Sequence, residues 1–405
     1  MTTATPMDEW KDIPWKKIER NVYKLQKRIY RASNRGEVKI VRKLQRLLIR
    51  SRSTKLLAVR KVTQDNQGKR TAGVDGVKSL TPEQRLKLAQ TLEIGKKANP
   101  VRRVWIPKPG TTDEKRGLGI PTMQNRALQT VVKLAFEPEW EAKFEPNSYG
   151  FRPGRSAHDA IEAIFKAIRC NPKWTLDADI AKCFDRIDQK ALLRKINTSP
   201  TIRCQIKAWL RAGVLDGDTL FPTQEGVPQG GTVSPLLMNI ALHGLETMIV
   251  KKFPHNRRKD FYSPIVVRYA DDLVVLHKDQ AVVKQCQEAI SEWLAEMGLE
   301  LKPSKTRIVH TLLESEAEVG FNFLGVNIRQ YQVGKTKTGK NTNGKPLGFK
   351  TIIKPSREAI QRHTQKLKET VNNHKASEQI ALIKNLNPII VGWSNYYSTI
   401  VSKRV

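Results

Sequence analysis

Four aspartates stand in two short apolar stretches of the sequence, where carboxylates are able to bind divalent cations. Asp271 and Asp272 join two aliphatic runs, a pattern that predicts a tight β-hairpin with both carboxylates at its tip. Asp177 and Asp179 lie in the strand-like stretch 174–180, and strand alternation points them to the same face. An isolated Asp-Asp pair would be interpreted as a polar turn. The second pair instead predicts that three carboxylates converge.

Clustered carboxylates need a cation to offset their mutual repulsion. An all-oxygen ligand set favours Mg²⁺, which keeps several waters and takes one or two carboxylates together with substrate phosphate oxygens. Two such ions, about 3.5–4 Å apart, stabilise the attacking and leaving oxygens of an in-line phosphoryl displacement. This chemistry serves nucleotidyl transfer. Because nucleases use the same ions, the carboxylates alone do not separate a polymerase from a nuclease.

Length and composition describe a folded protein with several domains. The 405 residues predict two to four folding units, and 39% hydrophobic residues are enough for packed cores. No apolar leader and no long uncharged apolar run occur, so we expect a soluble protein without a membrane partner, located in a bacterial cytoplasm, on its nucleoid or in an organelle. The four cysteines form no CxxC pair, which argues against a zinc finger or a disulfide framework.

The net charge of +33 indicates a polyanionic partner, and the excess lies toward the two ends of the chain. Residues 11–61 hold 18 Lys and Arg against 3 Asp and Glu, and residues 329–375 hold 12 against 2. Apolar residues recur every three or four positions in the first block, which predicts amphipathic helices with one packed and one cationic face. The candidate RNA-binding residues of that face are Lys16, Lys17, Arg20, Lys24, Lys27, Arg28, Arg31, Arg42, Lys43, Arg46 and Arg50.

The second basic block begins with a loop-like segment. Residues 331–349 are rich in Gly, Asn, Thr and Lys and lack apolar periodicity, so we predict a loop. It contains the spacing GxxxxGK, but Asn341 follows the lysine and Pro346 prevents the helix that a phosphate-binding loop requires. Helical patterning returns after Ser356, and a second helix is predicted to break near Pro388.

Ten motifs occur in one order, and together they resemble the reverse transcriptase/maturase proteins encoded by group II introns. The resemblance covers nearly the whole chain, and the ordered set is highly specific. In chain order the motifs are AGVDGV at 72–77, RVWIPK at 103–108, RGLGIPT at 116–122, SYGFRPGRS at 148–156, DIAKCFD at 179–185, GVPQGGTVSP at 226–235, YADD at 269–272, KPSKT at 302–306, FLG at 323–325 and GWSNYY at 392–397.

The resemblance implies an α+β fold of the right-hand polymerase type, with fingers, palm and an α-helical thumb. It implies a basic helical N-terminal region at 1–80, fingers and palm at 81–330, and the thumb, also called maturase domain X, at 331–405. Asp185 and Asp188 lie near Asp179 in the sequence, and we interpret them as helix-start or turn residues.

The same resemblance assigns roles at the metal site. Asp179, Asp271 and Asp272 become the catalytic carboxylates and the ligands of two Mg²⁺ ions, whereas Asp177 is left without a role. Lys305, in the KPSKT segment, resembles a lysine near the pyrophosphate leaving group, where general-acid help requires only hydrogen-bond reach.

Four further residues are implied at the nucleotide. Lys108 and Arg116 lie in two strand-like stretches that resemble a fingers hairpin, where cations hold the incoming triphosphate. Gln229 would contact the incoming nucleotide. Phe184, five residues after Asp179, matches the bulky residue that closes the pocket beneath the sugar and selects deoxynucleotides; its alternative is a core phenylalanine.

The function implied is an RNA-directed DNA polymerase that binds its parent group II intron RNA, assists its splicing and copies the intron into cDNA during retrohoming. Its partners are then the intron RNA, an RNA template with a DNA primer, dNTPs and target DNA. The alternatives are a retron-type or CRISPR-associated reverse transcriptase, an RNA-binding maturase without polymerase activity, and a nuclease.

Many relatives continue into a Cys/His-containing endonuclease, but the sequence to Val405 has no cysteine after Cys286, so we expect no DNA-cutting site within it.

Overall fold

The chain folds into two compact units, neither of which is continuous in sequence. The structure is a computed structural model that describes residues 9–95, 97–107, 114–314, 318–334, 336–341 and 343–402, apart from the side chain of residue 259. The first unit takes the described residues up to Glu145, with Lys182–Gly244 and Leu294–Leu299; the second takes Pro146–Ala181, Leu245–Trp293 and the described residues from Glu300 onward. These units do not follow the three consecutive segments that the sequence predicted.

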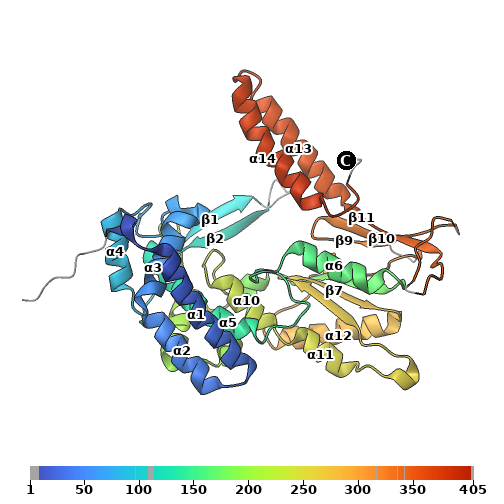
Figure 1. Cartoon of the computed structure of the whole chain (residues 1–405), viewed down its shortest axis with the longest axis horizontal. Helices are drawn as coiled ribbons and strands as arrows, with labels where there is room; N and C mark the ends of the chain where they lie inside the picture. Colours follow the sequence, from blue (N-terminus) through green and yellow to red (C-terminus); the bar gives the residue numbers. More distant parts are fainter. Residues whose placement is uncertain are drawn as a thin grey trace, which may run out of the picture. The chain divides into compact units, whose positions relative to one another are not determined.

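Helices that pack on α5 form one part of the first unit. Helix α5, Met123–Glu141, is buried along most of its length. Thr122 caps its N-terminus, since its side chain accepts from the backbone N–H of Asn125. It contacts α1 (Trp15–Asn34), α2 (Val38–Arg50) and α3 (Arg52–Arg60), as Figure 1 shows for the blue N-terminal helices. The predicted helices of the first basic block are therefore confirmed. Their buried residues include Ile18, Val22, Ile29, Val41, Leu44 and Leu48.

A small sheet and several short helices complete this unit. The strand order is β2-β1-β4-β5: β1 (Val101–Pro107) is antiparallel to β2 (Lys115–Ile120) and parallel to β4 (Val214–Asp216), and β5 (Thr219–Phe221) pairs with β4. The paired β1 and β2 confirm the two predicted strand-like stretches. The remaining elements are α4 (Pro82–Thr91), α7 (Cys183–Arg186), α8 (Gln189–Ile196), α9 (Pro200–Leu210), α10 (Ser234–Leu242), η1 (Trp10–Asp12), η2 (Lys61–Asp65) and η3 (Gln67–Arg70).

The second unit is organised around an antiparallel sheet of order β6-β7-β3-β8. Each strand is antiparallel to its neighbours in the sheet. Residues in the middle of the strands, such as Val267, Val274 and Val309, are fully buried. The strands are β3 (Trp174–Asp179), β6 (Ile265–Tyr269), β7 (Asp272–His277) and β8 (Arg307–His310). The neighbouring elements are α6 (Ala157–Ile168), α11 (Leu245–Lys252), η4 (Arg257–Lys259), α12 (Gln280–Ala295), whose last two residues belong to the first unit, and η5 (Pro303–Lys305).

A second sheet and two long helices end the chain. The sheet has the order β11-β10-β9, with β9 at Phe321–Phe323, β10 at Val326–Gln332 and β11 at Phe349–Pro355. The predicted loop is thus shorter than 331–349, because β10 and β11 take its ends, and the predicted domain boundary after residue 330 falls inside β10. Helices α13 (Arg357–Asn373) and α14 (Gln379–Tyr397) lie side by side (Figure 1).

Helix α14 corrects one expectation, since it continues through Pro388 and does not break there. Proline removes one backbone hydrogen bond and crowds the preceding turn, but α14 packs along α13 and its last residue, Tyr397, is buried. The mixture of helices and mainly antiparallel sheets agrees with the predicted α+β class. Among the described residues, no helix is both long and apolar enough to cross a membrane.

Candidate active site

The predicted carboxylate hairpin is present in the second unit. Strands β6 and β7 pair so that Tyr269 stands opposite Asp272, which leaves Ala270 and Asp271 as a two-residue turn. Asp272 also stands opposite Asp179, the last residue of β3, in the antiparallel register of β3 and β7. The backbone N–H of Ile180 donates to the carbonyl oxygen of Asp271 at 3.2 Å. Asp179, Asp271 and Asp272 therefore meet at one end of one sheet.

Two cations pair with the aspartates of β3. Lys305 Nζ lies 2.8 Å from Asp179 Oδ2, and Arg307 Nε lies 2.9 Å from Asp177 Oδ2. The side chain of Asp179 is only 16% exposed, so this ion pair is partly shielded from water. The hydrogen bond to Asp179 raises the pKa of Lys305, which keeps its ammonium charged. Asp177, which had no predicted role, has a structural partner in Arg307.

The electrostatics of the site favour binding of a further cation. Burial, followed by the neighbouring charges of Asp271 and Asp179, raises the pKa of Asp272 to about 7. Burial also raises the pKa of Asp177. Buried carboxylates that lie near other negative charges are stabilised by a positive charge, and oxygen ligands suit Mg²⁺. The chemistry of these oxygen donors is therefore of the kind that Mg²⁺ prefers.

The three carboxylates do not, however, form a ready-made cage. In the part of the chain that the structure describes, no group of three or more His, Cys, Asp or Glu side chains is placed so that it could hold a metal ion. Like charges repel, and Asp179 is already paired with Lys305. The sequence predicted that the three carboxylates converge. The structure places their residues close together in the sheet register, but the side chains do not form a complete set of metal ligands.

The carboxylate turn rests on a segment that sequence reasoning did not select as functional. Ala270 has a φ of +58°, which is uncommon for a residue other than glycine. Gly150 packs against it so closely that a Cβ on Gly150 would lie 2.4 Å from the nitrogen of Ala270. The buried side chain of Arg268 donates to the Ala270 carbonyl oxygen at 2.9 Å and to Ser148 Oγ at 2.6 Å. The SYGFRPGRS motif therefore positions the turn, and its glycine allows the close approach.

The predicted nucleotide residues that the structure describes lie in the first unit. Phe184 belongs to α7 and is half-buried, and its carbonyl oxygen accepts from Val227 N–H at 2.6 Å. A Cβ on Gly226 would lie 2.5 Å from the carbonyl oxygen of Asp185, so the glycine-rich loop lies directly on α7. Gln229 Nε2 donates to Asp185 Oδ1 at 3.3 Å. Contacts between α7 and the glycine-rich loop thus hold Phe184 and Gln229 in the same part of this unit.

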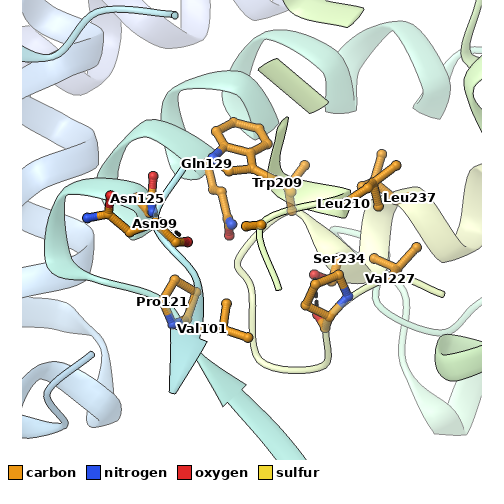
Figure 2. A pocket seen from close by; sticks show the side chains of 13 residues that line it. Asn99, Val101, Pro121, Asn125, Gln129, Trp209, Leu210, Val227, Ser234 and Leu237 are labelled. Atoms are coloured by element: carbon orange, nitrogen blue, oxygen red, sulfur yellow. Dashed lines mark hydrogen bonds between the residues drawn. The ribbon is translucent and has the colours of Figure 1, made fainter. Parts of the chain in front are cut away.

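The loop of residues 226–234 contributes to the lining of a small cavity. Figure 2 shows that Gln129, Trp209, Val227 and Ser234 line it, and Ser234 Oγ donates to the carbonyl oxygen of Pro228 at 2.7 Å. The cavity measures about 10 Å³, which is room for a single water and not for a nucleotide. The cavity is therefore too small to be a substrate pocket.

The other predicted residues have separate outcomes. Lys108 lies outside the described residues. Arg116 is exposed on β2, opposite Ile106 of β1. Asp188 is the N-cap of α8 and accepts from the backbone N–H of Ala191, which confirms its interpretation as a helix-start residue. Asp185 lies in the single turn of α7.

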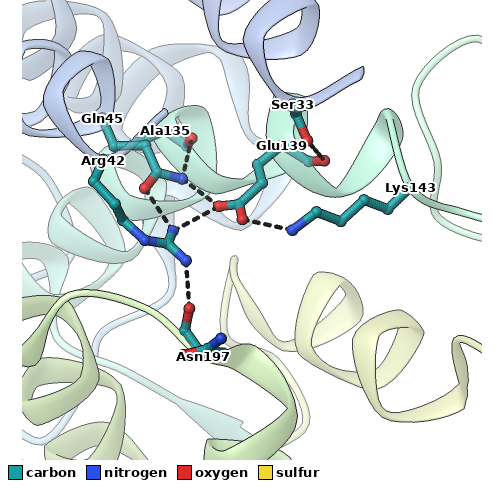
Figure 3. A network of polar contacts seen from close by, with 7 residues as sticks. All are labelled: Ser33, Arg42, Gln45, Ala135, Glu139, Lys143 and Asn197. Carbon is teal, nitrogen blue, oxygen red and sulfur yellow. Dashed lines mark hydrogen bonds and ion pairs between the residues drawn. The ribbon is translucent and has the colours of Figure 1, made fainter. Parts of the chain in front are cut away.

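Ten of the eleven predicted RNA-binding residues are exposed on α1 and α2, and Arg42 is the exception. Figure 3 shows that Arg42 points inward and pairs with Glu139 of α5 at 2.9 Å. The same carboxylate accepts from Gln45 at 2.6 Å and pairs with Lys143 at 2.7 Å, and Arg42 also donates to the backbone carbonyl of Asn197. The Glu139 side chain is only 4% exposed. We therefore remove Arg42 from the RNA-binding set.

Replacing Arg42 with Gln is expected to lower the free energy of unfolding by about 2 kcal/mol. The cost stays below the 3–5 kcal/mol of a fully broken buried pair because Lys143 and Gln45 remain on Glu139. Urea unfolding measures it, with Lys39→Gln on the exposed face of α2 as a control that should change stability by less than about 0.5 kcal/mol. Equal stability of the two variants would contradict a structural role for Arg42.

The FLG and GWSNYY motifs meet in the second unit. Tyr396 donates its hydroxyl to the carbonyl oxygen of Leu324 at 2.7 Å, and Tyr397 donates to that of Gly325 at 3.1 Å. Leu324 and Gly325 both have positive φ, at +49° and +79°, so this is a tight turn between β9 and β10. His158 of α6 contacts the Tyr396 carbonyl oxygen at 2.7 Å. The aromatic residues at the end of α14 therefore anchor it to this turn.

Comparisons with known proteins agree with this geometry. Residues 106–328 match the family described as reverse transcriptase (RNA-dependent DNA polymerase). Residues 10–92 match the N-terminal domain of reverse transcriptase, and residues 360–405 match the group II intron, maturase-specific domain. The chain belongs to the reverse transcriptase family, whose activity is RNA-directed DNA polymerisation. The maturase-specific domain further places it with the group II intron reverse transcriptases.

Individual relatives point the same way. The chain is 30% identical to protein YkfC of Escherichia coli over 70% of this chain and 82% of the relative. It is 36% identical to the group II intron-encoded protein LtrA of Lactococcus lactis over 46% of this chain, and 27% identical to maturase-like protein 1 of Euglena gracilis over 95% of this chain and 76% of the relative. The match spans only about a third of LtrA, at 32% of its length.

Proposed function

We propose that the chain extends a DNA primer on an RNA template at the carboxylate end of the β6-β7-β3-β8 sheet. The observation that carries the proposal is the register of that sheet, which sets Asp179 opposite Asp272 and beside the turn that holds Asp271. In this proposal the sheet is the palm, β1 and β2 belong to the fingers, and α13 and α14 form the thumb.

Asp179, Asp271 and Asp272 would hold two Mg²⁺ ions, which supply charge stabilisation to the attacking and leaving oxygens. The chain's own residues prepare the site. Arg268 and Gly150 fix the turn that carries Asp271, and the β3–β7 register fixes the other two carboxylates. Lys305, whose ammonium lies 2.8 Å from Asp179 at the same end of the sheet, would donate a hydrogen bond to the pyrophosphate leaving group.

The dNTP would be held by residues of the first unit. Lys108 and Arg116 are proposed to bind the triphosphate, since guanidinium binds phosphate bidentately and ammonium supplies a point charge. Gln229, oriented by its hydrogen bond to Asp185, would contact the nucleotide. Phe184 would lie beneath the sugar. Its half-buried position on α7 supports this role over that of a core phenylalanine.

Replacing Phe184 with Ala is expected to admit ribonucleotides, because the ring would no longer occupy the space that a 2′-hydroxyl needs. Selectivity for dNTP over rNTP should fall at least ~10-fold, by about the 1–3 kcal/mol typical of one pocket contact, and more than the rate with dNTPs falls. Single-nucleotide extension of a DNA primer measures both. Phe221→Ala, at an exposed ring on β5 of the same unit, is the control and should keep selectivity. Unchanged selectivity in Phe184→Ala would return the residue to a packing role.

The exposed cations of α1 and α2 are proposed to bind the parent group II intron RNA. Their number supports this, because each neutralised phosphate releases counterions. Through this contact the protein would assist splicing and then copy the intron into cDNA during retrohoming, with target DNA as a further partner. A bacterial cytoplasm or nucleoid, or an organelle, is the proposed location.

The whole proposal is tested with the purified protein, its parent intron RNA, and a DNA primer annealed to an RNA template in Mg²⁺. We expect accelerated splicing of the intron RNA and labelled cDNA. Splicing without cDNA would favour the RNA-binding maturase that lacks polymerase activity, and cDNA without splicing would favour a retron-type enzyme. The maturase-specific domain match supports the intron enzyme over the retron type.

A further inference from the structure

Two tyrosines on α1 lie on the exposed side of the helix. Tyr23 is 63% exposed and Tyr30 is 41% exposed, although the same helix buries Ile18, Val22 and Ile29 against its neighbours. The packed face of α1 is therefore formed by these buried residues without the two tyrosine rings. Exposed aromatic rings beside cations are the kind of side chain on which nucleotide bases stack.

The tyrosines alternate with cations along one stripe of the helix. Arg20, Tyr23, Lys27 and Tyr30 follow one another at spacings of three, four and three residues, and positions so spaced are neighbours on a helix surface. All four are exposed. At 1.5 Å per residue, the two rings are about 10 Å apart along the axis, with Lys27 between them.

The chemistry of this stripe fits unpaired nucleotides. A tyrosine face stacks on a base at about 1–3 kcal/mol per base without regard to sequence, and neighbouring cations bind the phosphates. Base pairing within a duplex hides those faces, so only loops, bulges and single strands can use the rings. A protein partner is less well matched, because lysine is depleted in protein interfaces and α1 carries seven Lys and Arg against one Glu.

We propose that the stripe Arg20–Tyr23–Lys27–Tyr30 is a binding site for unpaired RNA, in which Tyr23 and Tyr30 each stack on a base. The proposal rests on the proposed function of the basic face as an RNA-binding surface and deepens it. The cations would supply affinity that depends on salt, and the rings would restrict binding to single-stranded segments.

The test uses the full chain preloaded with a saturating, unlabelled primer–template, so that the polymerase site is occupied. Fluorescence anisotropy then measures binding of a labelled 20-nucleotide RNA without self-complementarity and of the matching RNA duplex, at several salt concentrations. The variants are Tyr23→Ala/Tyr30→Ala, Tyr23→Phe/Tyr30→Phe and Arg20→Gln/Lys27→Gln. Tyr262→Ala, at an equally exposed ring of the second unit, is the control.

We expect the alanine pair to weaken single-strand binding at least ~10-fold at every salt concentration, with an unchanged salt slope, because stacking releases no counterions. Duplex binding should change less than about twofold. The phenylalanine pair and Tyr262→Ala should bind like the unmodified protein. A 4-thiouridine in the single strand should crosslink to the peptide that contains Tyr23 or Tyr30.

Equal loss of single-strand and duplex binding in the alanine pair, or no loss at all, would overturn the stacking proposal. The Gln pair separates this from the underlying function, since it should reduce the salt slope by ~1.4–1.8 for two lost contacts. If the Gln pair reduces the salt slope and the alanine pair has no effect, the basic face would remain an RNA-binding surface and only the stacking would be ruled out. A slope unchanged in the Gln pair would remove the RNA-binding role of this stripe altogether.

Discussion

Replacing Asp271 with Asn is expected to lower the rate of cDNA synthesis by more than ~10²-fold, by analogy with the loss of one preorganised transition-state contact. The amide has the shape of the carboxylate but not its charge, so it removes a proposed metal ligand without a change of volume. The two-residue turn between β6 and β7 should persist, because Arg268 donates to the backbone carbonyl oxygen of Ala270, which the substitution leaves unchanged. Extension of a DNA primer on an RNA template in Mg²⁺ measures the loss, and thermal unfolding checks the fold.

Asp177→Asn is the matched control for this variant. Asp177 lies on β3, two residues before Asp179, and pairs with Arg307, which is partly exposed. Loss of this ion pair should cost no more than about 1 kcal/mol of stability, and cDNA synthesis should stay within severalfold of the unmodified rate. Near-normal extension by Asp271→Asn, or an equal loss in both variants, would contradict the assignment of Asp271 to the metal site.

Neutralising the lysines of α1 is expected to abolish assisted splicing while primer extension persists. The variant replaces Lys16, Lys17, Lys24 and Lys27 with Gln, all of which are exposed. Each lost phosphate contact should reduce the log–log salt slope of intron RNA binding by ~0.7–0.9, so the four together reduce it by about 3. Extension of a preannealed primer at saturating template should continue, because the substitutions leave the β3 and β6–β7 carboxylates unchanged.

The control removes the same number of positive charges elsewhere. Lys190, Lys251, Lys252 and Lys284 are exposed and lie outside the N-terminal helices, and their replacement by Gln should leave assisted splicing largely intact. Asp271→Asn should show the reverse of the α1 variant, with splicing but no cDNA. If the α1 variant and Asp271→Asn both lose both activities in parallel, one shared site or a folding defect explains the data better than two separable functions.

Local patterns in the sequence predicted the elements of the site correctly. The two aliphatic runs around Asp271 and Asp272 became β6 and β7, and the apolar stripe through Ile18, Val22 and Ile29 became the buried face of α1. These features depend on short-range sterics and on the repeat of strand or helix, which are written in neighbouring residues. The ordered motifs added the family, which the comparisons confirmed.

Partners distant in sequence were decided only by the tertiary structure. Arg42 has the composition and position of an RNA-binding residue, yet its charge is held by Glu139 of α5, which lies 97 residues away. Gly150 is required by the closeness of Ala270, and the tyrosines of GWSNYY find their acceptors 72 residues earlier, at Leu324 and Gly325. A side chain's partner is set by which elements pack together, and no local period encodes that choice. The sequence alone therefore determined the local elements and the family, and packing determined which neighbours hold the candidate side chains in place.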